Sequence, residues 1–251
     1  MKLFDLAGRT ALVTGGNGGI GLGMAQGLAA AGARVAIAGR DAAKAEAALA
    51  TLGPDAVFVP ADLSSREACG HTVDEAARRL GRLDILVNNA GTANRKRPEL
   101  LTEADWHGLL DLNLSATFFC CQAAHPHMQA AGGGKIVNIG SMMSLFGAPF
   151  AAAYGATKGG VVALTRSLAS AWAADGIQVN AVLPGWIDTD LTAGARQQVE
   201  GLNDTVLRRT PAGRWGRPED LAGIAVFLAS PASDFVTGTA IPIDGGFSAQ
   251  A

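Results

Sequence analysis

The chain has 251 residues, of which 49% are hydrophobic and 17% are charged. This composition excludes intrinsic disorder, and the length allows a sizeable core without disulfides or metals. The formal net charge of -2 gives no general attraction to nucleic acid or to an anionic membrane, so we expect neither as a partner. No apolar run in the sequence approaches the roughly 18 residues of a membrane span.

The cysteines and the first residues bear on the cellular compartment. Cys69, Cys120 and Cys121 are odd in number and lack C-x-x-C spacing, which favours buried free thiols over a disulfide framework or a zinc site. Residues 1–5 do not form a charged region followed by a long apolar core, as a signal peptide would. We therefore expect a cytoplasmic protein.

Short apolar runs alternate with longer helical stretches along the chain. The runs have the length and continuity of strands that are buried on both faces. They cover residues 10–14, 34–38, 56–60, 83–87, 135–139, 178–183 and 240–243. The segments between them, such as 41–52 and 64–80, are rich in helix formers. This order predicts an α/β fold over residues 1–251, a single Rossmann-like domain in which a doubly wound parallel sheet carries helices on both faces.

The first strand runs into a glycine-rich turn, T-G-G-N-G-G-I-G at residues 14–21, and we expect a helix from near Leu22. Gly16, Gly18 and Gly21 satisfy the pattern G-x-G-x-x-G. A phosphate can approach a backbone closely where no Cβ intervenes, and a helix N-terminus offers it free N–H groups. The turn therefore predicts a dinucleotide site. Its candidate cofactor contacts are Gly15, Asn17, Gly19, Ile20 and Gly21.

The end of the second strand bears on the choice of dinucleotide. Gly39 stands where an NAD enzyme normally has an acidic residue that binds the ribose hydroxyls, and Arg40 follows it. A guanidinium suits a 2′-phosphate, and the missing carboxylate removes a repulsion. The alternative is that Arg40 is a solvated loop residue and Asp41 simply a helix N-cap. We expect NADP(H) to be preferred, with NAD(H) still possible.

Two charged or metal-type clusters precede the fifth strand. The loop R-K-R at residues 95–97 lacks interleaved aromatic residues, which is typical of a solvated loop and not of a nucleic-acid site. Arg95 alternatively reaches the crevice and binds a substrate carboxylate. The segment H-P-H at residues 125–127 has no Cys or carboxylate beside it, so we predict a helix surface and no metal site.

A serine, a tyrosine and a lysine suit the chemistry of ketone reduction, which requires a hydride and a proton. Tyr154 and Lys158 stand at i and i+4, so they share one face of a helix, and Tyr154 is the only tyrosine. A nearby ammonium favours the phenolate and lowers the pKa of the phenol. Ser141 follows the strand at 135–139 and would stabilise charge on the substrate oxygen. Ser144 is the less favoured alternative.

Residues 186–218 break the alternation because they contain no strand pattern. We expect this segment to be a mobile lid over the active site.

These motifs, in this order, resemble those of the short-chain dehydrogenase/reductase family over nearly the whole chain. T-G-x-x-x-G-I-G at 14–21 resembles the family's glycine signature, and N-N-A-G at 88–91 resembles its element after strand four. The further cofactor contacts that the resemblance implies are Asp62, Leu63, Asn89, Ala90, Gly91, Tyr154, Lys158, Pro184, Gly185, Ile187 and Thr189. The catalytic tetrad that it implies is Asn113, Ser141, Tyr154 and Lys158, with Asn113 holding a water that links Lys158 to solvent.

Two short stretches, S-M-M-S at 141–144 and P-A-G-R-W-G at 211–216, resemble the sugar-acid dehydrogenases that act on gluconate or deoxygluconate. Several members of that group prefer NAD. Gly39 and Arg40 of this chain indicate NADP instead. The candidate substrate contacts are Arg95, Met143 and Trp186.

The resemblance also implies a homotetramer built on the helices around 105–128 and 154–174 and on the last strand. These helices carry more apolar residues than one sheet face can cover. Examples are Leu109, Leu112, Phe118, Val161 and Leu164.

The sequence therefore predicts an NAD(P)(H)-dependent oxidoreductase that acts on a carbonyl or secondary alcohol of a small polar compound such as a sugar acid. One alternative is a 3-oxoacyl thioester reductase that acts on acyl carrier protein, for which residues 95–97 would be the basic docking face. A second alternative is a dinucleotide-sensing protein without turnover. Such proteins typically lose the tyrosine or the lysine, and this chain keeps both.

Overall fold

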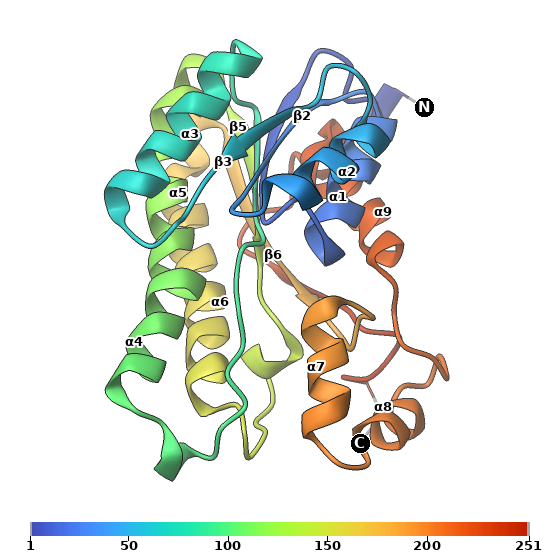
Figure 1. Ribbon diagram of the computed structural model, residues 1–251. Coiled ribbons are helices and arrows are strands. Elements are labelled where there is room, and N and C mark those ends of the chain that lie inside the picture. The colour runs from blue at the N-terminus through green and yellow to red at the C-terminus, as the bar shows by residue number, and fades with distance from the viewer. Residues whose placement is uncertain (1, 250–251) are drawn as a thin grey trace.

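A computed structural model describes residues 2–249, and a parallel sheet runs through its centre (Figure 1). Its strands are β1 (Thr10–Thr14), β2 (Arg34–Gly39), β3 (Val57–Pro60), β4 (Ile85–Asn88), β5 (Gly134–Ile139), β6 (Ile177–Pro184) and β7 (Ala240–Ile243). Their order in space is β3-β2-β1-β4-β5-β6-β7, and each neighbouring pair is parallel. The chain reverses its winding between β3 and β4, and such a switch point opens a crevice at the carboxyl ends of the strands. The predicted α/β fold is confirmed.

Helices cover both faces of the sheet, as Figure 1 shows. One layer consists of α1 (Gly19–Ala30), α2 (Ala42–Leu52) and α9 (Ala222–Ala229), and the other of α3 (Arg66–Leu80), α5 (Ala116–Ala130) and α6 (Ala152–Trp172). Successive strand residues point to opposite faces, so Ala11 and Val13 of β1 pack in the first layer and Leu12 packs in the second. The continuous apolar runs of the sequence thus supply two cores at once.

The first helix begins earlier than the sequence predicted. It starts at Gly19 and not near Leu22, because Gly18 is its N-cap and the Leu22 amide donates to the Gly18 carbonyl over 3.1 Å. Gly19 has a φ of 51°, which a glycine adopts without steric cost. The turn and the start of the helix therefore overlap.

The segment without a strand pattern contains two helices, α7 (Asp190–Gln198) and α8 (Leu202–Arg209). Leu202 and Val206 of α8 are buried with Ala195 of α7 in a small apolar cluster, against which Trp186 and Trp215 pack. A single bridge joins Ile187 to Gly216 at the base of this segment. Within residues 2–249, no helix is long and apolar enough to cross a membrane.

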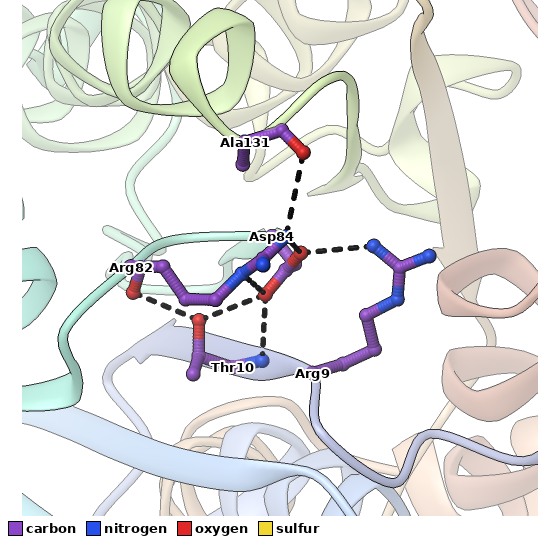
Figure 2. Close-up of polar contacts among 5 residues, drawn as sticks. All are labelled: Arg9, Thr10, Arg82, Asp84 and Ala131. Carbon is purple, nitrogen blue, oxygen red and sulfur yellow. Dashed lines mark hydrogen bonds and ion pairs between the residues drawn. The ribbon is translucent and has the colours of Figure 1, made fainter.

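The amino edge of the sheet is held by one buried carboxylate, shown in Figure 2. The Asp84 side chain is 2% exposed and accepts hydrogen bonds from Arg9 Nη1 and Arg82 Nε, each over 2.9 Å, and from the Thr10 amide over 3.0 Å. Burial opposes ionisation of Asp84, but the two arginines and the Thr10 amide outweigh it and hold the pKa of the carboxyl below its ordinary value. This network joins the start of β1 to the segment before β4, away from the crevice.

We expect Asp84→Ala to lower the free energy of unfolding by about 2–4 kcal/mol, because it leaves two guanidinium groups and a backbone amide without their acceptor. Urea denaturation measures this, with Asp55→Ala at an exposed site as the control. Because the folded pKa of Asp84 is depressed, its stabilisation is present above the unfolded pKa of about 3.9 and is lost as pH falls through the folded value. Equal losses in both variants would contradict the structural role of Asp84.

Candidate active site

A groove of about 610 Å³ lies where the loops after β1, β2, β3 and β4 meet. Most of the predicted cofactor contacts line it. These are Gly15, Asn17, Gly19, Ile20, Arg40, Asp62, Leu63, Asn89, Ala90, Gly91 and Thr189. The structure therefore brings together residues from loops that are far apart in the sequence.

The glycine-rich turn has the form of a cradle for an anion. No side chain caps the N-terminus of α1, and a Cβ added to Gly18 would meet no atom within 4 Å. Helix N–H groups therefore face open space, as a pyrophosphate requires. Gly21 acts differently from the prediction, since a Cβ there would come within 2.3 Å of the Gly15 carbonyl oxygen. It allows close packing beneath the groove and does not line it.

Asn89 fastens the loop after β4 to the turn after β1. Its Nδ2 donates to the carbonyls of Thr14 over 3.0 Å and of Gly15 over 3.1 Å. In return, the Thr14 hydroxyl accepts from the amides of Asn89 and Ala90, over 3.0 and 3.1 Å. The Asn89 amide group is thus committed to holding the turn, although the residue also lines the groove.

Arg40, at the end of the second strand, is exposed. Arg40 lines the groove, and Asp41 is the N-cap of α2, accepting from the Lys44 amide over 3.0 Å. A Cβ at Gly39 would meet the Asn17 amide at 3.0 Å, so this corner fits glycine best. Lys44 also lines the groove, and the sequence analysis missed it. The sequence could have indicated it, because Lys44 follows Arg40 by about one helical turn and so reaches the same side of the groove.

A smaller pocket of about 100 Å³ contains two of the predicted catalytic residues, Ser141 and Tyr154, and the three candidate substrate contacts. Its lining includes Arg95, Ser141, Met143, Tyr154, Pro184, Gly185 and Trp186. Ser141 follows β5, and its hydroxyl accepts from the Met143 amide over 3.1 Å, while Tyr154 of α6 lines the same pocket. Leu191 of α7 lines both this pocket and the larger groove, so the two spaces are adjacent.

Ile187 is a predicted cofactor contact that the structure places elsewhere. Its side chain is 3% exposed and packs in the apolar core, and it lines neither the large groove nor the small pocket. Its carbonyl accepts from the Thr192 hydroxyl over 2.6 Å, which fixes the chain just before α7.

Lys158 is buried under Tyr154. Its Nζ donates to the Ile139 carbonyl over 2.7 Å and lies 5.8 Å from the centre of the Tyr154 ring. Burial lowers the pKa of Lys158 to about 8. Burial also raises the pKa of Tyr154, and the Ser141 side chain and the charge of Arg95 only partly oppose that rise. The sequence predicted that Lys158 would lower the pKa of the phenol, whereas the opposing cation in the structure is Arg95.

Asn113 lies in a π-helical turn, Asp111–Ser115, between α4 (Glu103–Leu110) and α5. Its side chain accepts from the Thr92 amide and donates to the Thr92 carbonyl, both over 2.9 Å, and it donates to Thr157 of α6 over 3.3 Å. Asn113 therefore holds the loop after β4 against α6. Its role in binding a water stays a prediction.

Ser144 is a positioning group rather than a substitute for Ser141. Its hydroxyl donates to the Lys158 carbonyl over 2.8 Å and accepts from the Ser141 amide over 3.2 Å. It thus joins the turn after β5 to helix α6, and it does not line the small pocket. The structure favours Ser141 as the serine that meets a substrate.

The basic loop at residues 95–97 is not a free cationic surface. Lys96 pairs with Asp105 over 2.6 Å, and Arg97 pairs with Glu99. Arg95 donates to the Leu191 carbonyl of α7 over 2.8 Å. Of the three, only Arg95 lines the pocket.

The two histidines of α5 each face one carboxylate. His125 lies 2.9 Å from Asp175 and His127 lies 2.7 Å from Asp74. In the part of the chain that the structure describes, no group of three or more His, Cys, Asp or Glu residues is placed to hold a metal. Cys69, Cys120 and Cys121 are free and buried.

The chain is similar to known proteins over almost its full length. Residues 15–248 match the family model described as Enoyl-(Acyl carrier protein) reductase. The chain is 43% identical over 246 residues to a 2-dehydro-3-deoxy-D-gluconate 5-dehydrogenase of Bacillus subtilis, covering 97% of this chain and 96% of that protein. It is 42% identical over 249 residues to a gluconate 5-dehydrogenase of Gluconobacter oxydans, covering 98% and 97%. The crystal structure of a gluconate 5-dehydrogenase from Burkholderia cenocepacia in complex with NADP and tartrate matches with a TM-score of 0.94 and 42% identity, over 100% of this chain and 99% of that one.

The balance of charges around Tyr154 can be measured directly, because it is the only tyrosine. We expect its phenol to titrate above the ordinary pKa of about 10 in the protein alone, since burial is the largest effect. Arg95→Gln should raise this pKa further by removing a nearby positive charge. Ultraviolet difference absorbance, with the tryptophan background subtracted, follows the titration.

Arg97→Gln is the matched control, because it removes the same charge from the same loop at a residue that pairs with Glu99. A pKa of Tyr154 that is unchanged in Arg95→Gln, or that shifts equally in the control, would show that Arg95 does not act on the phenol.

Proposed function

The chain belongs to the short-chain dehydrogenase/reductase family, and we propose that it transfers a hydride between NADP(H) and the carbonyl or secondary alcohol of a small sugar acid. The observation that carries this proposal is the pocket in which Ser141, Tyr154 and Arg95 face the same space, beside a groove that suits a dinucleotide. The similar proteins named as gluconate and 2-dehydro-3-deoxygluconate dehydrogenases support the same substrate class.

The residues divide the chemistry between them. A bound nicotinamide would supply or accept the hydride at the carbonyl carbon. In the direction of reduction, the Tyr154 hydroxyl gives its proton to the carbonyl oxygen, and the Ser141 hydroxyl donates a hydrogen bond to that oxygen. Oxidation of the alcohol reverses these transfers. Lys158, whose pKa burial lowers to about 8, is the buried amine one helical turn from Tyr154, and it can take up or release a proton near neutral pH.

Arg95 supplies the proposed recognition of an acid. It is a half-buried guanidinium in a pocket whose other walls include Met143 and Trp186. A guanidinium binds a carboxylate through two parallel hydrogen bonds, which places the rest of the substrate relative to Tyr154. The Burkholderia cenocepacia protein was crystallised with tartrate, which is itself a hydroxy acid.

The two alternatives are less well supported. A carrier-protein substrate would need a basic docking face, but Lys96 and Arg97 already pair with Asp105 and Glu99. A sensing protein without turnover has no need of Ser141 and Tyr154 in one pocket, which this chain keeps.

We further propose that residues 186–218 form a lid of the single domain. Arg95 holds the start of α7 through the Leu191 carbonyl, and such a contact can exchange when a substrate carboxylate binds. Hydrogen exchange in this segment should slow when cofactor and substrate bind. Equal exchange with and without both ligands would argue for a rigid surface.

A homotetramer is proposed on different residues from those that the sequence suggested. Leu109 and Val161 are 3% and 0% exposed, so they belong to the core of the chain itself. Support comes instead from Trp106 on α4, which is 40% exposed, and from Phe235 before β7, which is 104% exposed. Light scattering tests the assembly, and a stable monomer at micromolar concentration would rule it out. A cytoplasmic location is proposed with it, because the three cysteines are free thiols.

A panel of oxo acids and matched oxo compounds without a carboxylate tests the proposed function, with the consumption of NADPH and NADH followed in parallel. The acids should be preferred. Tyr154→Phe should lower kcat by at least about 100-fold, because a positioned acid contributes roughly 10²–10⁴ to the rate. Circular dichroism and cofactor binding serve as controls for its fold. If Tyr154→Phe keeps more than about a tenth of kcat, the proton comes from another group.

The proposed cofactor preference is tested at the end of β2. Gly39→Asp with Arg40→Ile should shift the kcat/KM ratio toward NADH by at least about tenfold, or ~1.4 kcal/mol. Because a Cβ at Gly39 crowds the Asn17 amide, Arg40→Ile alone should be measured as well. Arg78→Ile on α3, at an exposed ion pair with Glu75, is the control. An unchanged ratio in the folded double variant would remove Arg40 from the choice of cofactor.

A further inference from the structure

An ion pair spans the cofactor groove from one wall to the other. Lys44 Nζ, in the first turn of α2, lies 2.7 Å from Asp190 Oδ2, the side chain of the first residue of α7. Both residues line the groove. The contact raises the pKa of Lys44 and lowers the pKa of Asp190. The pair therefore joins the lid segment to the corner of the groove where Arg40 lies.

The groove is lined by two cations, Arg40 and Lys44, and by the carboxylates of Asp41, Asp62, Asp188 and Asp190. The Asp41 carboxylate is committed to the Lys44 amide as the helix cap, whereas the Asp190 carboxylate reaches the Lys44 ammonium from the opposite wall. Asp190 is thus the carboxylate of the protein itself that occupies the Lys44 ammonium, and it belongs to the proposed lid, residues 186–218.

We propose that Lys44 is a second residue that selects NADP(H) and that Asp190 competes with the 2′-phosphate for its ammonium. This rests on the proposed function, since it concerns the cofactor of the same site. The Lys44 side chain is 57% exposed and the Asp190 side chain 91% exposed, and an ion pair between exposed groups stabilises a protein little. A phosphate carries roughly -1.5 to -2 charge near neutral pH and three acceptor oxygens, so it outcompetes one carboxylate.

A consequence is that the two cofactors leave the lid in different states. NADP(H) takes Lys44 from Asp190, so α7 keeps the contact of Arg95 with the Leu191 carbonyl and loses the contact with α2. NAD(H) has no 2′-phosphate and leaves the pair of Lys44 and Asp190 in place. The choice of cofactor is thereby linked to the segment that borders the substrate pocket.

Direct binding of NADPH and of NADH to the full chain, followed by tryptophan fluorescence or calorimetry, tests the proposal without turnover. Lys44→Gln should weaken NADPH binding by about tenfold, the size of one charged hydrogen bond, and leave NADH within about twofold. Asp190→Asn should tighten NADPH binding by about threefold, because it releases Lys44 from an exposed ion pair. In the Lys44→Gln background, Asp190→Asn should lose this selective effect.

Arg78→Gln is the matched control, since it removes one positive charge and one exposed ion pair on α3, away from the groove. Equal weakening of NADPH and NADH by Lys44→Gln, or weaker NADPH binding in Asp190→Asn, would overturn the proposal. A wild-type protein that binds neither dinucleotide would overturn the proposed function as well. A wild type that prefers NADPH, with a preference that survives Lys44→Gln, would overturn only the role of Lys44.

Discussion

The site depends on how closely the turn after β1 approaches the loop after β4. A Cβ at Gly21 would come within 2.3 Å of the Gly15 carbonyl oxygen and within 2.4 Å of Asn89 Nδ2, so the turn, helix α1 and the Asn89 amide meet only because no side chain intervenes. The same loop continues to Gly91, where a Cβ would lie 3.0 Å from Asn113 Oδ1 and 3.7 Å from Lys158 Nζ. A continuous series of close contacts thus connects the cofactor groove with the helix that carries Tyr154.

Burial sets the electrostatics at the far end of this series. It raises the pKa of Tyr154 and lowers the pKa of Lys158, so both groups favour their neutral forms in the protein alone. Arg95 enters this environment from the loop after β4 and acts on the phenol through its charge. A substrate carboxylate that neutralises Arg95 would therefore raise the pKa of Tyr154. Binding of the acid is thereby linked to proton transfer.

The start of α7 lies between the two halves of the site. Lys44 reaches Asp190 from the wall of the groove, and Arg95 reaches the Leu191 carbonyl from the wall of the pocket. Both cations have a second proposed partner, the cofactor phosphate for one and the substrate carboxylate for the other. The pair of Lys44 and Asp190 exchanges easily because it lies at the surface, where a single ion pair is weak. Because the two contacts are separate, cofactor and substrate would each release a different contact of α7.

Local patterns in the sequence determined much of this molecule. The seven apolar runs became the seven strands of the sheet, with shifts of at most a few residues at their ends, because continuous hydrophobicity reports burial on both faces. The spacing of Tyr154 and Lys158 placed them one turn apart on α6, since helix geometry is local. The glycine-rich turn and the helix after it were also predicted, although α1 begins at Gly19 and not near Leu22.

The tertiary structure alone decided which distant groups meet. It turned Ser144 toward the Lys158 carbonyl, buried Leu109 and Val161 within the chain, and brought Lys44 to Asp190 across 146 positions. It also brought Arg95, from the loop after β4, to where its charge acts on the phenol. Periodicity and spacing fix the conformation of neighbouring residues. Pairing between loops depends on the order of the strands and on which side chains burial leaves within reach, and neither is written in any short stretch of the chain.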